Sequence, residues 1–251
     1  MQLPLVAPAP VVVEHAQVFR QLFENRRQFQ HFENYLTGLM VLSNKSMANI
    51  SRCVLESADK TNLSRFFSEA PWEQEKVNEK RITYMLEQTS KQRRKAAQSC
   101  VSVDDTLCEH VGSMFEYVAR HYDHCEGRYP LGHNLVTTHY VSGAVRFPLD
   151  VRLYRRYEEQ TRWEAFVRKY FPEREIPTES KKRTRLHKEV DESLLQDTEF
   201  RALHTQFRTK IALAIELIEQ AVARNVPFQI VLMDSWFLCA EVAEELAKLQ
   251  K

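Results

Sequence analysis

The sequence predicts a mixed α+β or α/β fold, in which a helical N-terminal region is followed by a mixed sheet with helices. Apolar residues recur at three- and four-residue steps from Glu14 to about Ala97, which is the period of amphipathic helices. At Ser99 the pattern changes to short apolar runs, and two of these runs end in a carboxylate. They are Gln98–Asp105, with the sequence QSCVSVDD, and Gln229–Asp234, with the sequence QIVLMD. We therefore expect strands that hold acidic groups rigidly at the edge of a sheet.

The composition allows one large domain or two smaller ones, because the 251 residues are 43% hydrophobic and 27% charged. Only 5 residues are glycine, and no glycine-rich phosphate-binding loop occurs. The net charge of +1 means that affinity for nucleic acid must come from local patches. The five cysteines show no C-x-x-C spacing, which is typical of reduced thiols in the cytoplasm. No apolar run reaches the roughly 18 residues that predict a transmembrane helix.

Residues 1–13 are expected to be a disordered lead-in, and residues 14–97 a helical domain. Within the domain, short helices are expected at Met47–Ser57 and Leu63–Ala70, joined by a polar turn, which is the outline of a helix-turn-helix. The side chains at the second helix that could reach phosphates and base edges are Lys60, Asn62 and Arg65. A helical bundle with a solvated polar face explains the same pattern, so the pattern leaves both interpretations open.

Residues 98–251 are expected to contain the sheet. Its first strand, Cys100–Val103, is expected to end at the sequence Asp104-Asp105-Thr106. A meander should follow, with its last strand at an edge or a bulge because it contains Pro148. The strands of this meander are predicted at Met114–Arg120, Val136–Val141 and Val145–Tyr154.

A long amphipathic helix, Phe200–Asn225, is expected after the meander, because isoleucine and valine recur along it at steps of four, three and four. It leads to the strand Gln229–Asp234. That strand is apolar on both faces, as in the middle of a sheet covered by helices. A further helix is expected at Ala240–Leu249.

The segment 152–190 is predicted to be a basic insertion or connection, with 12 Lys or Arg against 7 Glu. Aromatic side chains that could stack on bases precede its most basic part. A solvated loop is the plain alternative to a site that tracks a phosphate backbone. The basic residues proposed to contact nucleic acid are Lys181, Lys182, Arg183, Arg185 and Lys188.

The strongest candidates for chemistry are the two strand-terminal carboxylates. Asp104, or its neighbour Asp105, could bind Mg²⁺ or Mn²⁺ together with Asp234, since these ions take one or two carboxylates along with phosphate oxygens and water. Such ions activate an attacking hydroxyl or water and stabilise the leaving oxygen in phosphoryl transfer. An Asp after a strand is also common turn chemistry, which is the alternative here.

Two rival constellations are less well supported. Five histidines and two cysteines could suggest zinc, but they lack the paired close spacing of zinc sites and fall on the strand meander. A cysteine nucleophile beside a histidine lacks a flanking motif that would orient it or form an oxyanion hole. The residues concerned are His110, His121, His124, His133, His139, Cys108 and Cys125.

Four segments together carry a family resemblance. They are Asn44–Trp72 (NKSMANISRCVLESADKTNLSRFFSEAPW), Ser102–Thr106 (SVDDT), Gly127–Gly143 (GRYPLGHNLVTTHYVSG) and Val231–Phe237 (VLMDSWF). In combination they resemble the DDE transposases of bacterial insertion sequences, over most of Phe29–Leu246. The resemblance implies a helical DNA-binding region at 14–97 and a ribonuclease-H-like catalytic core at 98–251.

The resemblance further implies metal-dependent strand cleavage and transfer at the ends of a mobile element. The second catalytic Asp of the family corresponds to Asp234. The first corresponds to Asp104, two residues before Thr106, with Asp105 as the alternative. The implied partner is double-stranded DNA at mobile-element ends, with a homo-oligomer possible, and the implied cofactor is Mg²⁺ or Mn²⁺. The implied setting is the bacterial cytoplasm, at the nucleoid when bound to DNA, without a membrane.

The chain departs from the family pattern after Asp234. The third acidic residue of the family is a Glu on a later helix, whereas Glu241, Glu244 and Glu245 lie on a helix directly after the strand. We therefore expect a C-terminally truncated, inactive enzyme with an incomplete ribonuclease-H-like core. The alternatives are a non-catalytic DNA-binding regulator or inhibitor of the full-length transposase, and a remnant without a stable fold.

Overall fold

The structure is a computed structural model, and it describes residues 4–54, 60–112, 114–123 and 126–249. The chain divides into two compact units, Met1–Ser90 and Lys91–Lys251, so the boundary falls slightly before the expected one at residues 97 and 98. Among the helices described, none combines the length and the hydropathy needed to cross a bilayer.

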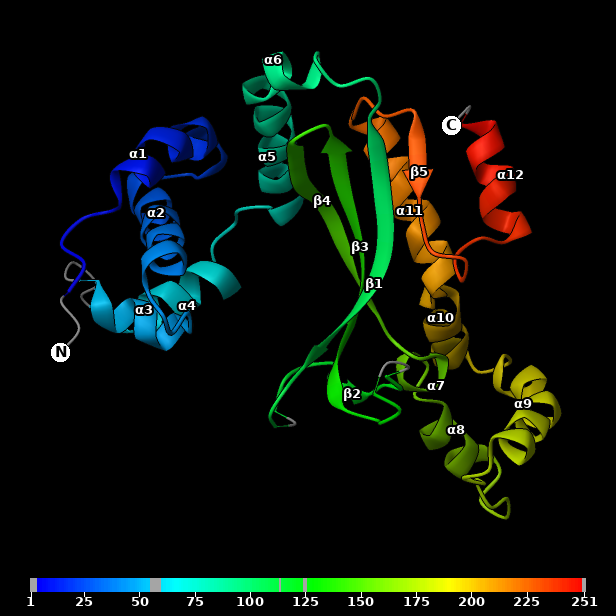
Figure 1. Cartoon of the computed structure of the whole chain (residues 1–251). Helices are drawn as coiled ribbons and strands as arrows, with labels where there is room; N and C mark the ends of the chain where they lie inside the picture. Colours follow the sequence, from blue (N-terminus) through cyan, green and yellow to red (C-terminus); the bar gives the residue numbers. More distant parts are fainter. Residues whose placement is uncertain (1–3, 55–59, 113, 124–125, 250–251) are drawn as a thin grey trace. The chain divides into compact units, whose positions relative to one another are not determined.

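The N-terminal unit is built from helices (Figure 1). Two of them begin at capping residues: the Asn25 side chain accepts the N–H of Gln28, and the Ser46 side chain accepts the N–H of Asn49. Residues 55–59, which include the end of the first predicted short helix and the start of the predicted turn, lie outside the described residues, and the rest of that turn is the start of α4. The helices are α1 (Pro10–Ala16), the 3-10 helix η1 (Gln17–Leu22), α2 (Arg26–Val41), α3 (Met47–Cys53), α4 (Lys60–Ser68) and α5 (Gln74–Gln88), and α6 (Ser90–Arg93) lies at the boundary.

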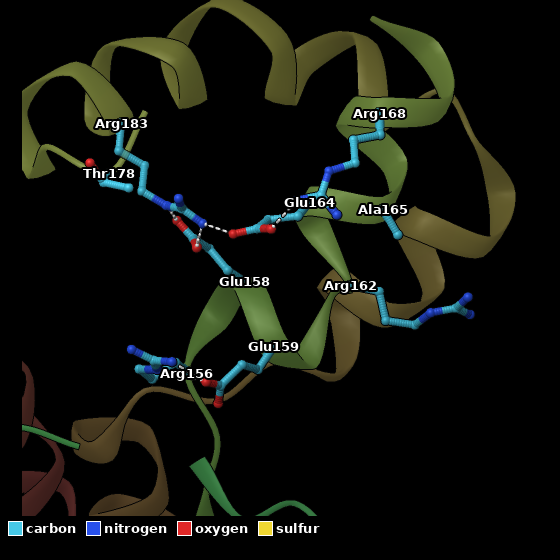
Figure 2. A pocket seen from close by; sticks show the side chains of 9 residues that line it. All are labelled: Arg156, Glu158, Glu159, Arg162, Glu164, Ala165, Arg168, Thr178 and Arg183. Atoms are coloured by element: carbon cyan, nitrogen blue, oxygen red, sulfur yellow. Dashed lines mark hydrogen bonds and ion pairs between the residues drawn. The ribbon is translucent and has the colours of Figure 1, made fainter. Parts of the chain in front are cut away.

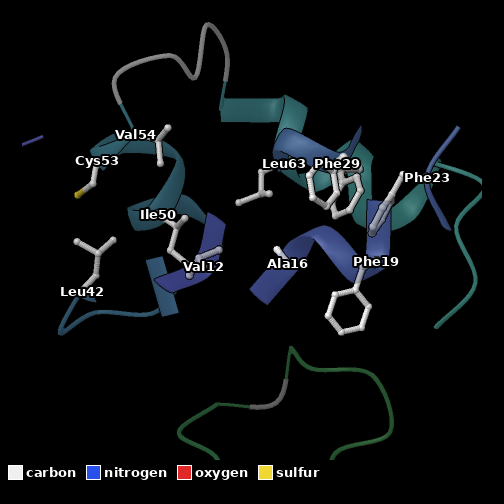
Figure 3. Packing of buried hydrophobic residues seen from close by; sticks show 11 residues of the cluster. Val12, Ala16, Phe19, Phe23, Phe29, Leu42, Ile50, Cys53, Val54 and Leu63 are labelled. Carbon is white, nitrogen blue, oxygen red and sulfur yellow. The ribbon is translucent and has the colours of Figure 1, made fainter. Parts of the chain in front are cut away.

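Aromatic side chains form much of the core of this unit, and α1 packs into the same core (Figure 3). The Phe23 ring centroid lies 5.0 Å from that of Phe32 and 6.0 Å from that of Phe66. Trp72 stacks on Phe66 at 5.4 Å and donates its Nε1–H to the Phe66 carbonyl oxygen. The expectation of a disordered lead-in over 1–13 is wrong for residues 10–13, because Val12 is buried, which contributes about 1.5–3 kcal/mol.

Gly38 allows α2 and α3 to approach closely, and Gly38→Ala is expected to lower the free energy of unfolding by about 1–2 kcal/mol. A Cβ atom at Gly38 would lie 2.6 Å from a side-chain carbon of Ile50, which is fully buried and has little room to move. Urea denaturation followed by circular dichroism measures the effect. Met40→Ala, at an exposed position of the same helix, is the control. A Gly38→Ala variant as stable as the wild type would show that the two helices are not held this closely.

The C-terminal unit is built around a mixed five-stranded sheet (Figure 1). One edge of β3 pairs with β1. The other edge of β3 pairs with β2 near the start of β3 and with β4 along the rest of its length, and all three pairings are antiparallel. β5 pairs with the far side of β1 and is parallel to it, so the chain must cross over between β4 and β5. The strands are β1 (Cys100–Glu109), β2 (Ala119–Arg120), β3 (Leu131–Ser142), β4 (Val145–Tyr154) and β5 (Ile230–Leu232).

Helices make up the crossover between β4 and β5, and the last of them, α11, covers one face of the sheet. This helix contacts β3 and β4 through its buried stripe of Leu213, Leu217 and Ile218. The preceding helices have a small core of their own around Trp163, Phe166 and Phe200. The helices are α7 (Tyr157–Gln160), α8 (Trp163–Tyr170), α9 (Ser180–Leu194), α10 (Thr198–Gln206) and α11 (Lys210–Ala223), and α12 (Ala240–Lys248) follows β5.

Several expected elements are corrected. The first strand does not stop before Asp104, because β3 is long enough to pair with it as far as Glu109. Of the strand expected at Met114–Arg120, only β2 forms; the positive φ of Tyr117 is incompatible with an extended run. The helix expected at Phe200–Asn225 is interrupted after α10, since Phe207 is extended and the Thr209 side chain caps α11.

Other expectations for this unit are confirmed. Pro148 lies on β4, which pairs only with β3 among the strands described, and the register shifts where Pro148 meets His139. The helix expected at Ala240–Leu249 is present as α12. A mixed sheet of antiparallel strands, followed by a helical crossover to a strand parallel with the first, is compatible with the ribonuclease-H-like core expected from the sequence.

Candidate active site

The pairing of β1 with β5 brings the two candidate acidic segments into one sheet. The parallel register joins Ser102 to Leu232, and each candidate Asp lies two residues further along its own chain. If the register continues, Asp234 is level with Asp104 on neighbouring strands. The acidic groups were expected at two strand ends. Instead, Asp104 lies inside the longer β1, whereas Asp234 follows the end of β5.

Asp104 and Asp105 lie on opposite faces of the sheet, because side chains alternate along a strand. Asp105 lies on the face covered by α11, where its Oδ2 accepts a hydrogen bond of 2.5 Å from the Lys210 Nζ. Asp104 lies on the other face and is exposed, and its Oδ1 accepts the backbone N–H of Asp105. Of the two residues, Asp105 therefore has the structural partner and Asp104 has a carboxylate open to solvent.

The turn after β5 fixes the position of Asp234. Its Oδ1 accepts the backbone N–H groups of Trp236 and Phe237 at 3.0 and 3.2 Å. Phe237 is fully buried, so its side chain anchors this turn to the core. Asp234 itself is exposed, and among the described residues neither it nor Asp104 forms an ion pair. Neither carboxylate therefore has a competing cation among the described residues, and exposed carboxylates are the kind of ligand that Mg²⁺ and Mn²⁺ prefer.

The group of three acidic side chains that lie close enough together to share an ion, among the described residues, includes neither Asp104 nor Asp234. The three acidic side chains there whose ligand atoms lie within 4.8 Å of one another are Glu109, Asp123 and Glu126. Arg128 forms ion pairs with Glu109 and Glu126, so this cluster already contains a positive charge. It is exposed at one end of β1 and is a poor candidate for the metal site expected at Asp104 and Asp234.

The histidines do not assemble a zinc site among the described residues. The His133 Nδ1 lies 2.8 Å from the His110 Nε2, and its other ring nitrogen lies 2.7 Å from the Glu116 carbonyl oxygen. His121 is buried, and burial is the main cause that lowers its pKa. His124 and Cys125 lie outside the described residues.

The basic run at 181–188 lies in the first part of helix α9. It is therefore part of a regular helix and not a solvated loop. Arg183 forms ion pairs with Glu158 and Glu164 beside a cleft of about 740 Å³ (Figure 2). Burial acts to raise the pKa of Glu158, but hydrogen bonds from Arg183 and His187 outweigh it, and the pKa is lowered. The role of Arg183 is therefore to hold α9 against the preceding helices.

The other basic residues of this run are exposed on α9. Lys182 and Arg185 form surface pairs with Glu179 and Glu189, and such pairs contribute little stability. Lys181 and Lys188 are exposed as well. These four side chains are placed where a phosphate backbone could reach them.

Two of the expected DNA-contacting residues in the N-terminal unit lie together. Asn62 and Arg65 of α4 line a shallow cleft of about 290 Å³ with Arg27 and His31 of α2. Burial lowers the pKa of His31, assisted by the charge of Arg27. Lys60 begins α4, but its side chain lies outside the described part of the structure.

Sequence reasoning missed Lys210, the residue that separates the roles of the two neighbouring aspartates. A signal was available, because Lys210 opens α11, where the positive end of the helix dipole disfavours a cation. A lysine at such a position indicates a specific acidic partner.

Comparison with known proteins gives one match. The family model described as DDE superfamily endonuclease matches residues 18–250. No curated protein and no solved structure matches the chain.

Proposed function

The chain belongs to the DDE superfamily endonuclease family, and on this basis we propose that it is a DNA transposase, or a form of one, from an insertion sequence. The proposed reaction is metal-dependent strand cleavage and transfer at the ends of the mobile element. The observation that supports the proposal is the parallel register of β1 and β5, which pairs Ser102 with Leu232, two residues before Asp104 and Asp234 respectively. Asp105 is assigned a structural role through Lys210.

Asp104 and Asp234 would hold Mg²⁺ or Mn²⁺. When bound, such an ion would neutralise phosphate charge and activate the attacking hydroxyl or water. The chain itself contributes a rigid strand for Asp104 and a hydrogen-bonded turn for Asp234, so both carboxylates are positioned before a substrate arrives.

We further propose that the chain by itself binds metal weakly and does not turn over. The family resemblance implies a third carboxylate, and the group of three acidic side chains found among the described residues, Glu109, Asp123 and Glu126, includes neither Asp104 nor Asp234. The alternative function follows from the same observation: a non-catalytic DNA-binding regulator, which inhibits the full-length transposase through mixed oligomers.

DNA binding and catalysis are separable in this proposal. The purified chain is expected to bind duplex DNA at low salt, and the double variant Asp104→Ala, Asp234→Ala is expected to bind equally well. Fluorescence anisotropy with a labelled duplex measures this. Metal-dependent nicking by the chain would contradict the proposed inactivity, and a complete lack of duplex binding would remove both the transposase and the regulator proposals.

The exposed lysines of α9 are expected to supply part of the salt dependence of binding. Replacing Lys181, Lys182 and Lys188 by alanine should reduce the slope of log affinity against log salt by about 1 for each lost phosphate contact. Lys248→Ala removes an equally exposed lysine of α12 and is the control. An unchanged slope in the triple variant would show that α9 does not contact DNA.

A further inference from the structure

The C-terminal unit contains a cleft of about 580 Å³ beside the turn that follows Asp234. It is assembled from segments far apart in the sequence: the region around β2, the ends of β3 and β4, the start of α11 and the turn after β5. Its wall includes Tyr122, Tyr129, Asn134, Tyr154, Lys210 and Trp236. This wall has two independent properties that bear on what the cleft binds.

The first property is a buried acceptor without a partner. The side chain of Asn134, on β3, is part of a residue only 6% exposed, and its Oδ1 accepts no hydrogen bond among the described residues. Leaving a buried polar atom unpaired is unfavourable, and native proteins rarely do so. Because Asn134 lines the cleft, a ligand with an N–H donor would satisfy this oxygen.

The second property is a set of aromatic rings that face solvent at the same place. Trp236 is 57% exposed and Tyr129 is 60% exposed. The Tyr122 and Tyr129 rings lie 4.9 Å apart at a tilt. Lys210 is located 5.6 Å from the centroid of the Trp236 ring while it pairs with Asp105, which helps to fix the indole at the cleft. Large rings exposed together are typical of a stacking surface.

The charges around the cleft indicate which part of a nucleotide it suits. Lys210 is paired with Asp105 and Arg156 with Glu159, and Glu241 adds a carboxylate. Arg120 donates to the carbonyl oxygen of Tyr129, which is an uncharged acceptor. The cleft is therefore close to neutral overall, which suits a base better than a string of phosphates.

Two further polar side chains in the wall, His121 and Tyr154, are uncharged near neutral pH. Burial lowers the pKa of His121 and raises that of Tyr154, so both side chains remain neutral there. Neutral groups of this kind form hydrogen bonds with the edges of a base without attracting a bare anion.

We propose that this cleft binds one unpaired nucleobase of a DNA substrate. The base stacks on the exposed rings of Trp236 and Tyr129 and donates an N–H to the Oδ1 of Asn134. The proposal rests on the proposed function, because DNA is taken as the substrate. It assigns to the cleft a role next to the turn that carries Asp234, and it predicts that the protein distinguishes unpaired from fully paired DNA.

The test uses the full chain and two labelled duplexes that differ by one unpaired adenine. Stacking of one base should give about 10-fold tighter binding of the duplex with the unpaired base. With 2-aminopurine at that position, stacking should also quench its fluorescence. Trp236→Ala should abolish both effects and leave affinity for the paired duplex unchanged. Leu238→Ala, an exposed apolar residue of the same turn that does not line the cleft, is the control and should behave as the wild type.

Asn134→Leu provides a second variant that is nearly equal in size and lacks the acceptor. Its melting temperature should equal or exceed that of the wild type, since an unpaired buried oxygen is removed, and its preference for the unpaired base should fall. Binding of both duplexes with equal affinity by the wild type would overturn this inference and leave the proposed function intact. Failure to bind either duplex would overturn both.

Discussion

Asp104→Asn and Asp234→Asn are each expected to weaken Mn²⁺ binding at least about 10-fold, because even residues that only orient a metal ligand change affinity by about 10–100-fold. Each substitution removes a negative charge and a ligand oxygen while keeping the size of the side chain. Asp105→Asn is expected to retain Mn²⁺ binding, since Asp105 lies on the other face of the sheet and pairs with Lys210. Electron paramagnetic resonance of free Mn²⁺ measures the affinity of all three variants.

Thermal denaturation separates loss of a ligand from loss of the fold. Asp104→Asn should melt as the wild type does, because Asp104 is exposed and its Oδ1 accepts a single backbone N–H. Asp105→Asn should melt at a lower temperature, because Lys210 loses its partner at a part-buried position. The reverse pattern of metal affinity, with Asp105 needed and Asp104 dispensable, would contradict the assignment.

Arg183→Met is expected to lower the free energy of unfolding at pH 7 by about 2–3 kcal/mol. Breaking a fully buried ion pair costs about 3–5 kcal/mol, and the cost here is smaller because Arg183 is only partly buried. The guanidinium of Arg183 pairs with Glu158 and Glu164 and lies 5.4 Å from the centroid of the Trp163 ring (Figure 2). The variant leaves two carboxylates facing each other in a partly desolvated cleft. Trp163 stacks on His187, so tryptophan fluorescence in denaturant, measured with Trp72 and Trp236 replaced by phenylalanine, reports the unfolding of this region.

The destabilisation by Arg183→Met should shrink as the pH falls below the ordinary Glu158 pKa of 4.5. In the wild type the pKa of Glu158 is lowered, so its ionised form stabilises the fold above that range, and this contribution is lost as the pH falls through the lowered pKa. Without Arg183, only His187 is left to oppose the effect of burial, so the pKa of Glu158 is lowered less and the variant has less stability to lose in acid. A destabilisation that is equal at pH 7 and pH 3 would show that Arg183 acts through packing alone.

The sequence was sufficient for the elements with strong periodic signals. The buried stripe of α11 follows from a local pattern, and the structure has it. The strand before Asp234 is present but shorter than expected, and among the described strands β5 lies at the edge of the sheet and not in its middle, because only β1 pairs with it. The extent of β1 was not predictable from its own residues, because two adjacent aspartates are poor strand formers and only pairing with β3 extends the strand through them.

The candidate site was only partly accessible to sequence reasoning. Alternation along a strand separates Asp104 from Asp105, but the local sequence does not show which face a helix covers. The contact between Asp105 and Lys210, which lies 105 residues further along the chain, identifies the face that the helix covers. The cleft around Asn134 was missed for the same reason, since its wall comes from separate segments that only the fold brings together.

We propose that Asp104 and Asp234 meet on neighbouring segments of the sheet and hold one cation. Fe²⁺ can replace Mg²⁺ in such sites, and with peroxide and ascorbate it cuts the backbone near its ligands, so mapping the cuts by mass spectrometry locates the ion. We predict cuts near both Asp104 and Asp234, both lost in either single Asn variant and both retained in Asp105→Asn. Cuts confined to one of the two segments, or to the cluster of Glu109, Asp123 and Glu126, would contradict the account.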